Sequence, residues 1–221
     1  MQDWIRDLYR HPDMLRMGHA QRLEDLNLGL GWLYYALARI IRGRTVVVIG
    51  SYRGFAPMVL AKALADNLEG GRLVFIDPSL VDDFWKDPEA VRAHFAGFGI
   101  RNIEHAQMTT QEFVKTDCYR DLEDVGLVFI DGYHTDEQAR FDHEAFSGKL
   151  ANDGIALFHD SIRPRLSRIY GSDKTYEHTV YRYMDELKKR TDLQCFDFPF
   201  DSGLTLVRKG GDGADTGDPQ D

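Results

Sequence analysis

The sequence predicts an α/β fold, in which a doubly wound and mostly parallel sheet carries helices on both faces. From residue 44 onward, short β-branched or apolar runs alternate with segments of helical pattern. The first such run ends in a glycine loop that leads directly into a helix. This strand, loop and helix form the unit from which doubly wound sheets are built.

Residues 45–54 form this unit and read Thr-Val-Val-Val-Ile-Gly-Ser-Tyr-Arg-Gly. The run Val46–Ile49 is typical of a buried parallel strand. After Gly54 a helix is expected to continue through Asp66, with Pro57 in its first turn, where a missing N–H costs nothing. The loop N–H groups and the helix N-terminus then face a cofactor that carries a carboxylate or hydroxyls.

An acidic residue follows the next predicted strand. Residues 72–78 read as a second buried strand that ends in Asp77, 27 positions after Gly50. This spacing corresponds to one strand–helix–strand unit, and a carboxylate at that tip can accept both hydroxyls of a ribose. Capping of a helix is the alternative role.

The later elements follow in order. Asp87-Pro88-Glu89 predicts a capped helix that runs to about Phe98, and residues 101–106 predict a third strand. A helix is expected from Asp136 to Leu150, ending near residues 152–154. The stretches Leu193–Phe200 and Leu204–Arg208, separated by a turn at residues 201–203, predict a hairpin.

Two strand ends are the most informative motifs. Residues 127–134 read Leu-Val-Phe-Ile-Asp-Gly-Tyr-His, and residues 154–161 read Gly-Ile-Ala-Leu-Phe-His-Asp-Ser. With the G-x-x-x-G loop, these motifs resemble class I S-adenosylmethionine (SAM) methyltransferases, in the branch similar to macrocin-type and catechol-type O-methyltransferases. The resemblance covers residues 30 to 209 and implies a seven-stranded sheet closed by the C-terminal antiparallel hairpin. The family often has an acidic residue where this chain has Val48.

The resemblance implies a SAM-dependent O-methyltransferase acting on a hydroxyl of a small polar metabolite, of the sugar or natural-product type. It assigns cofactor binding to a set of loop and strand-end residues: Gly50, Ser51, Tyr52, Gly54, Asp77, Met108 and Asp131. Adenine is expected near residues 107–109.

The chemistry of the acceptor side is open between a metal site and a metal-free base, and a third alternative is that Asp131 and Asp160 only cap strands and bond to loops. The candidate catalytic residues are Asp131, His134, His159 and Asp160. In metal-dependent relatives, acids after the fourth and fifth strands hold Mg²⁺, so Asp131, His159 and Asp160 are the candidate metal ligands. His159 stands where those relatives carry an acid, and imidazole suits Mn²⁺, Fe²⁺ or Zn²⁺ better than Mg²⁺. Either a divalent metal is bound, or no metal is bound and His134 or His159 is the base.

The segment 162–190 contains eight Lys or Arg against four acidic residues, with tyrosines interleaved. Arg163, Arg165 and Arg168 follow the fifth strand and are candidates to hold an anionic group of the acceptor. The alternative is that they pair with acids of the N-terminal helices or of a second subunit. His143, inside a predicted helix, is expected to be structural.

Three segments are expected: helices in residues 1–43, the catalytic domain in 44–209 and a disordered acidic tail in 210–221. The N-terminal helices either pack on the sheet edge or on a second subunit of a homodimer, or they cover the active site. The net charge of −9 argues against nucleic acid as substrate. Two cysteines without paired spacing, the charged N-terminus and the lack of a long apolar run indicate a cytoplasmic protein without a membrane partner.

Two other function classes remain open. A NAD(P)-dependent oxidoreductase would use a similar fold, but the second glycine of G-x-G-x-x-G is missing here. A catalytically inactive SAM-fold binding protein would keep the loop and Asp77 without turnover.

Overall fold

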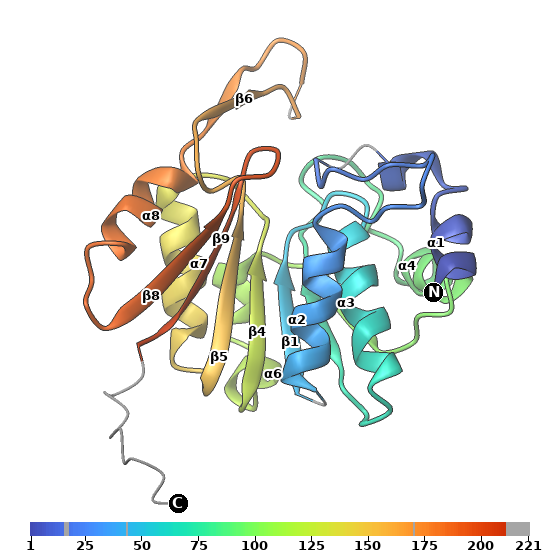
Figure 1. Cartoon of the computed structure of the whole chain (residues 1–221), viewed down its shortest axis with the longest axis horizontal. Helices are drawn as coiled ribbons and strands as arrows, with labels where there is room; N and C mark the ends of the chain where they lie inside the picture. The colour runs from blue at the N-terminus through green and yellow to red at the C-terminus, as the bar shows by residue number, and fades with distance from the viewer. Residues whose placement is uncertain (16–17, 43, 170, 211–221) are drawn as a thin grey trace, which may run out of the picture.

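The computed structural model describes residues 1–15, 18–42, 44–169 and 171–210. Its centre is a seven-stranded sheet with the strand order β3-β2-β1-β4-β5-β9-β8 (Figure 1). The neighbours from β3 to β5 pair in parallel, whereas β9 is antiparallel to both β5 and β8. The predicted sheet and its C-terminal antiparallel hairpin are therefore confirmed.

The strands alternate with helices along the chain. The sheet strands are β1 (Thr45–Ile49), β2 (Leu73–Ile76), β3 (Ile103–Ala106), β4 (Val125–Ile130), β5 (Leu150–His159), β8 (Leu193–Phe198) and β9 (Leu204–Lys209). The helices are α1 (Gln2–Leu8), the 3₁₀ helix η1 (Pro12–Leu15), α2 (Gly31–Ile41), α3 (Phe55–Asp66), α4 (Pro88–Gly97), α5 (Thr110–Phe113), α6 (Asp117–Arg120), α7 (Asp136–Ser147) and α8 (Val180–Leu187). A separate two-stranded sheet contains β6 (Arg165–Ser167) and β7 (Tyr176–His178).

Strand β1 shows why the sheet is covered on both faces. Val46 and Val48 belong to one apolar cluster, together with residues of α2 and α3, while Val47 and Ile49 belong to a second, together with residues of α7 and α8. Successive side chains of a strand point to opposite faces, so a continuous apolar run requires a helical layer on each side. These layers are visible in Figure 1.

Helix α4 begins as its sequence predicts. Its N-cap is Asp87, whose side chain accepts from the backbone N–H groups of Glu89 and Ala90. The prediction for α7 was wrong at its C-terminal end, because this helix stops at Ser147 rather than near Leu150. The backbone from Leu150 instead pairs with Val125 of β4, so this stretch is the extended start of β5.

The N-terminal segment packs on a face of the sheet rather than on its edge. Helix α2 lies against α3 and β4, and Ile5 and Met14 are buried in the same cluster. Its loop at Gly18 also reaches the carboxyl ends of the strands, where the β6–β7 hairpin approaches from the other side (Figure 1). Most of the predicted acidic tail, residues 211–221, lies outside the described residues.

Candidate functional site

A cavity of about 570 Å³ opens at the carboxyl ends of the central strands. It lies where the strand order reverses, between β1 and β4, which is the position at which open α/β sheets bind ligands. The lining comes from the loops after β1, β2, β3, β4 and β5, from the N-terminal segment and from the β6–β7 hairpin. Segments distant in sequence therefore meet at one site.

In the glycine loop after β1, close packing explains why position 50 is a glycine. This residue has φ +69°, and a Cβ placed on it would lie 2.4 Å from the Cα of Gly132. The loops after β1 and β4 are thus in backbone contact, which only glycine allows. Gly50, Ser51 and Tyr52 line the cavity. Gly54, with φ +90°, instead allows Trp85 and Phe95 to pack close to the start of α3.

Asp77 lies at the end of β2, as predicted, and it lines the cavity while only 9% exposed. Its Oδ1 accepts from the backbone N–H of Ser79 at 2.7 Å, which fixes the turn. Burial raises the pKa of Asp77 to about 6, against the opposing effect of backbone hydrogen bonds from Ser79 and Ser51. A carboxylate held in this way can accept hydrogen bonds from a bound ligand.

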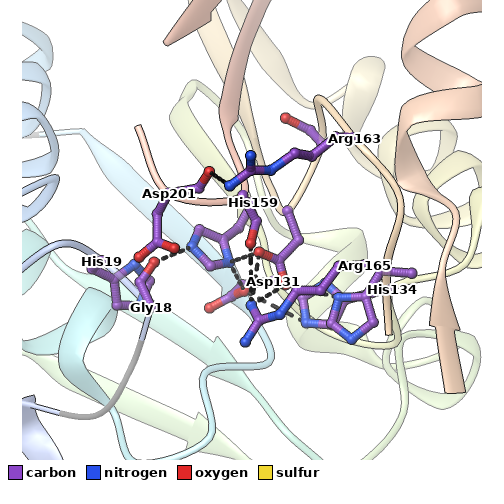
Figure 2. Close-up of polar contacts among 12 residues, drawn as sticks. Gly18, His19, Asp131, His134, His159, Arg163, Arg165 and Asp201 are labelled. Carbon is purple, nitrogen blue, oxygen red and sulfur yellow. Dashed lines mark hydrogen bonds and ion pairs between the residues drawn. The ribbon is translucent and has the colours of Figure 1, made fainter. Parts of the chain in front are cut away.

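The side chain of His159 pairs with the carboxylate of Asp131 across the ends of two neighbouring strands (Figure 2). The distance from Nδ1 to Asp131 Oδ1 is 2.9 Å, and Nε2 lies 3.3 Å from the backbone carbonyl of Gly18. Nε2 needs a proton to donate to that carbonyl, and the nearby Asp131 carboxylate favours a second proton on Nδ1. Burial is the largest single influence and would lower the pKa of His159, but the charge and hydrogen bond of Asp131, the charge of Asp160 and the Gly18 carbonyl together raise it to about 9. His159 is therefore an imidazolium at neutral pH.

The carboxylate of Asp160 is enclosed by two other donors. Its Oδ2 lies 2.8 Å from Nδ1 of His178, and Nη1 of Arg165 lies 3.1 Å and 3.0 Å from its two oxygens. Burial opposes ionisation, yet the bond from His178 and the nearby positive groups bring the pKa of Asp160 well below its usual range. Asp160 therefore stays ionised and anchors the β6–β7 hairpin.

His134 has the opposite charge state to His159. Its ring stacks on that of His178, with centroids 4.3 Å apart and planes 10° apart. Its Nε2 lies 3.8 Å from Asp131 Oδ1. Burial is the largest influence and lowers the pKa of His134 to about 4, although both acids favour its charged form. A neutral imidazole thus faces the cavity beside a charged one.

Four predicted residues do not line the cavity. Gly54 lies behind the loop, and Met108 packs in the apolar cluster under α7, so Thr109, Thr110 and Gln111 form the wall after β3. Arg163 donates to the backbone carbonyl of Asp201, as Figure 2 shows. Arg168 is exposed. Of the three candidate arginines, Arg165 alone lies among the lining residues.

Sequence reasoning missed three buried titratable residues of the lining, His19, His178 and Asp142. His19 stacks on Phe55 and donates to or accepts from the Tyr34 hydroxyl at 3.0 Å, and burial lowers its pKa to about 3. For His178 the only sequence signal was its place in the basic, tyrosine-rich segment. His143, in contrast, is structural as expected, because it bonds with the Tyr183 hydroxyl at 2.7 Å away from the cavity lining.

Each of the predicted metal ligands, Asp131, His159 and Asp160, already lies against a charged or polar group of the protein. Nδ1 of His159 lies 2.9 Å from the nearer oxygen of Asp131, and the carboxylate of Asp160 contacts Arg165 and His178. Two cations of the protein thus already balance the two carboxylates. Among the described residues, His134, Asp160 and His178 offer ligand atoms within 4.8 Å of one another, but they share this same engaged Asp160. Metal binding by Asp131, His159 and Asp160 therefore stays a prediction.

Comparison with known proteins supports the fold and the family. Residues 47–161 match the family model described as methyltransferase domain. A search of curated protein sequences found no significant match. The described helices include none with the length and apolar character needed to cross a membrane.

Solved structures give the same fold. The O-methyltransferase TomG from Streptomyces achromogenes, in complex with SAM, superposes with a TM-score of 0.62 at 18% identity, covering 95% of this chain and 89% of that one. An O-methyltransferase from Bacillus cereus in complex with S-adenosylhomocysteine gives 0.63 at 14%, covering 94% and 91%. A methyltransferase from Geobacter sulfurreducens gives 0.61 at 19%, covering 94% and 88%.

Proposed function

Because this chain belongs to the methyltransferase-domain family and is a SAM-dependent methyltransferase, we propose that it methylates a hydroxyl oxygen of a small polar metabolite. One observation carries the proposal: a single cavity joins the glycine loop and Asp77 to the pairs formed by Asp131, His134 and His159. One end of the cavity suits the cofactor and the other suits proton transfer. The match to the methyltransferase-domain family disfavours the alternative of a NAD(P)-dependent oxidoreductase.

At the cofactor end, the loop after β1 and Asp77 would hold SAM. The backbone N–H groups near Ser51 suit a carboxylate, and Asp77 suits the ribose hydroxyls. When bound, SAM supplies a methyl group on a positively charged sulfur. The chain holds the acceptor oxygen in line with that carbon, an effect that contributes on the order of 7–11 kcal/mol to such reactions.

At the other end, His134 takes the proton of the acceptor hydroxyl. Its pKa, lowered by burial to about 4, leaves it unprotonated at physiological pH, and the charges of Asp131 and Asp160 offset part of the burial that weakens it as a base. Asp131 lies 3.8 Å from Nε2 of His134 and stabilises the imidazolium that forms. His159 is already protonated, so its role is to hold Asp131 in place and to place positive charge near the oxyanion.

The cavity rim indicates the body of the acceptor. Tyr52, Val81 and Ile169 are about two-fifths exposed, while Leu80 and Tyr133 are more so, and all five line the cavity. Exposed apolar side chains grouped at one opening mark a binding surface. Such walls suit a phenolic ring or the apolar face of a sugar. An anionic substituent would use the N–H groups of Arg165 that Asp160 leaves available.

Methyl transfer from radiolabelled SAM to a panel of catechols, phenols and sugars tests the proposal. Methyl transfer should occur. It should persist in EDTA, because in this proposal His134 rather than a metal ion takes the proton of the hydroxyl. His134→Ala should lower kcat by about 10²–10⁴-fold, the usual contribution of a general base. Binding of S-adenosylhomocysteine by this variant, measured by titration calorimetry, should stay within a few-fold of wild type.

Two results would contradict this assignment. Loss of activity in EDTA, restored by a divalent metal, would replace the histidine base with a metal site. Failure of the wild-type protein to bind S-adenosylhomocysteine would reject methyl transfer itself. As a control, His143→Ala removes a histidine that does not line the cavity, and it should leave kcat near wild type in the protein that remains folded.

A further inference from the structure

Asp142 is a buried carboxylate of α7 that lines the cavity and has no part in the proton transfer described above. It is 1% exposed. We propose that Asp142 recognises the exocyclic amino group of the cofactor adenine and so selects adenine over other purines. This inference rests on the proposed function, because it concerns the same cofactor.

The carboxylate is oriented by a chain of amide groups. Its Oδ1 accepts from Nε2 of Gln138 at 2.8 Å, and Oε1 of Gln138 accepts from Nε2 of Gln111 at 2.7 Å. Thr110 also bonds to Asp142 through its side chain. Gln111, Thr110 and Gln138 all line the cavity, so the chain forms part of its wall beside the loop after β3.

The second carboxylate oxygen lies close to Gly132. A Cβ placed on Gly132 would lie 3.9 Å from Asp142 Oδ2, and Gly132 itself lines the cavity. Because Gly132 has no side chain, nothing from that residue screens Oδ2 from a flat ligand. The position thus combines an oriented acceptor with a neighbouring lining residue that carries no side chain.

The chemistry of this position suits a hydrogen-bond donor without charge. No charged side chain of the described residues forms an ion pair with Asp142, and burial raises its pKa to about 6. A buried carboxylate needs hydrogen-bond donors to remain ionised at neutral pH. The amino group of adenine supplies such donors, whereas hypoxanthine places a carbonyl oxygen there.

The position also agrees with the length of the cofactor. Asp77, at the end of β2, is assigned to the ribose, and β2 and β3 are neighbours in the sheet. The base attached to that ribose would extend toward the loop after β3, which carries Thr110 and Gln111. The proton-transfer groups lie on the other side, at the ends of β4 and β5.

Calorimetric titration with S-adenosylhomocysteine and S-inosylhomocysteine tests the inference, because the two ligands differ in the group at carbon 6 of the purine. Wild type should bind the adenosyl ligand about 10–100-fold more tightly, which corresponds to the 1.5–3 kcal/mol of a hydrogen bond to a charged group. Asp142→Asn offers an N–H₂ group to the carbonyl of hypoxanthine. Its preference for the adenosyl ligand should therefore fall by tenfold or more.

Each other outcome has a defined meaning. If wild type binds both ligands with equal affinity, the inference is overturned. This measurement needs no variant, so the inference stays testable if Asp142→Asn does not fold. A variant that weakens both ligands equally shows that Asp142 only supports the wall, and also overturns it. Glu144→Gln makes the same chemical change on the exposed side of α7 and should keep the wild-type preference. Absence of binding by either ligand to wild type would instead reject the proposed function.

Discussion

The imidazolium of His159 and the carboxylate of Asp131 form a buried ion pair, with 2.9 Å between Nδ1 and Oδ1, at the tips of two neighbouring parallel strands. A second histidine, His134, approaches the same oxygen at 3.8 Å without being charged. One carboxylate therefore lies beside a charged ring and a neutral ring, and the two rings lose their protons in different pH ranges.

The first prediction concerns the pH dependence of kcat/KM. A base must be unprotonated, so activity should be lost only as pH falls through about 4, the lowered pKa of His134. An ordinary histidine would give a limb near pH 6.5. Activity should also fall as pH rises through about 9, where His159 loses its proton. The His159→Gln variant should lack this alkaline limb, and an unchanged alkaline limb in that variant would assign it to another group.

The second prediction concerns the contact between the loops after β1 and β4. Gly50→Ala should lower the free energy of unfolding by roughly 2–5 kcal/mol, since it combines a positive φ with a Cβ 2.4 Å from Gly132 Cα. Gly70→Ala is a matched control, because Gly70 has φ +72° but no atom within 4 Å of the added Cβ. It should cost about 1 kcal/mol. Urea unfolding measures both, and equal losses would show that the loop contact carries no energy.

The third prediction separates the arginines after β5. Arg165→Ala removes the guanidinium from Asp160 and should lower kcat/KM roughly tenfold or more, because a buried carboxylate loses a charged partner. Arg168→Ala changes an exposed residue outside the cavity lining and should stay within about twofold of wild type. Steady-state kinetics with the acceptor identified from the panel make the comparison. Equal losses in both variants would indicate a general effect of positive charge rather than a contact.

The fourth prediction concerns stability. The pKa of Asp142 is raised by burial from 3.8 to about 6 in the folded protein, so the unfolded chain gives up this proton at lower pH. Stability from this group is greatest at low pH and is lost as pH rises through about 6. Between pH 5 and pH 7, wild type should lose about 1 kcal/mol of unfolding free energy relative to Asp142→Asn. Parallel urea titrations of the two proteins at both pH values measure this difference, and a constant difference would mean that Asp142 titrates alike in both states.

Local patterns were sufficient for most of the sheet and for part of the cavity lining. Val46–Ile49 and the glycines after it predicted β1 and its loop, because an uninterrupted apolar strand must be covered on both faces. Asp131, His159 and Asp160 were expected together because the carboxyl ends of parallel neighbours meet at one edge. These relations depend on the order of elements, which a sequence displays directly.

The remaining features depend on tertiary contacts. His178 reaches Asp160 because Thr179 ties the end of β7 to the loop after β4: its N–H bonds to the carbonyl of His134 at 2.8 Å. His19 comes from a loop that no periodic pattern describes. The charge of each histidine was equally inaccessible, since a difference of about one ångström in the distance to Asp131 accompanies opposite shifts at His159 and His134.

The bond between His159 Nε2 and the carbonyl of Gly18 joins residues 141 positions apart. It requires a proton on Nε2, so protonation of the ring and seating of the N-terminal loop favour each other. By thermodynamic linkage this coupling is reciprocal. Any change that moves the loop away from the strand ends also lowers the pKa of His159. The loop near the beginning of the chain is thereby coupled to the charge of a ring at the strand ends, through this hydrogen bond and the contact of the His19 ring with His159.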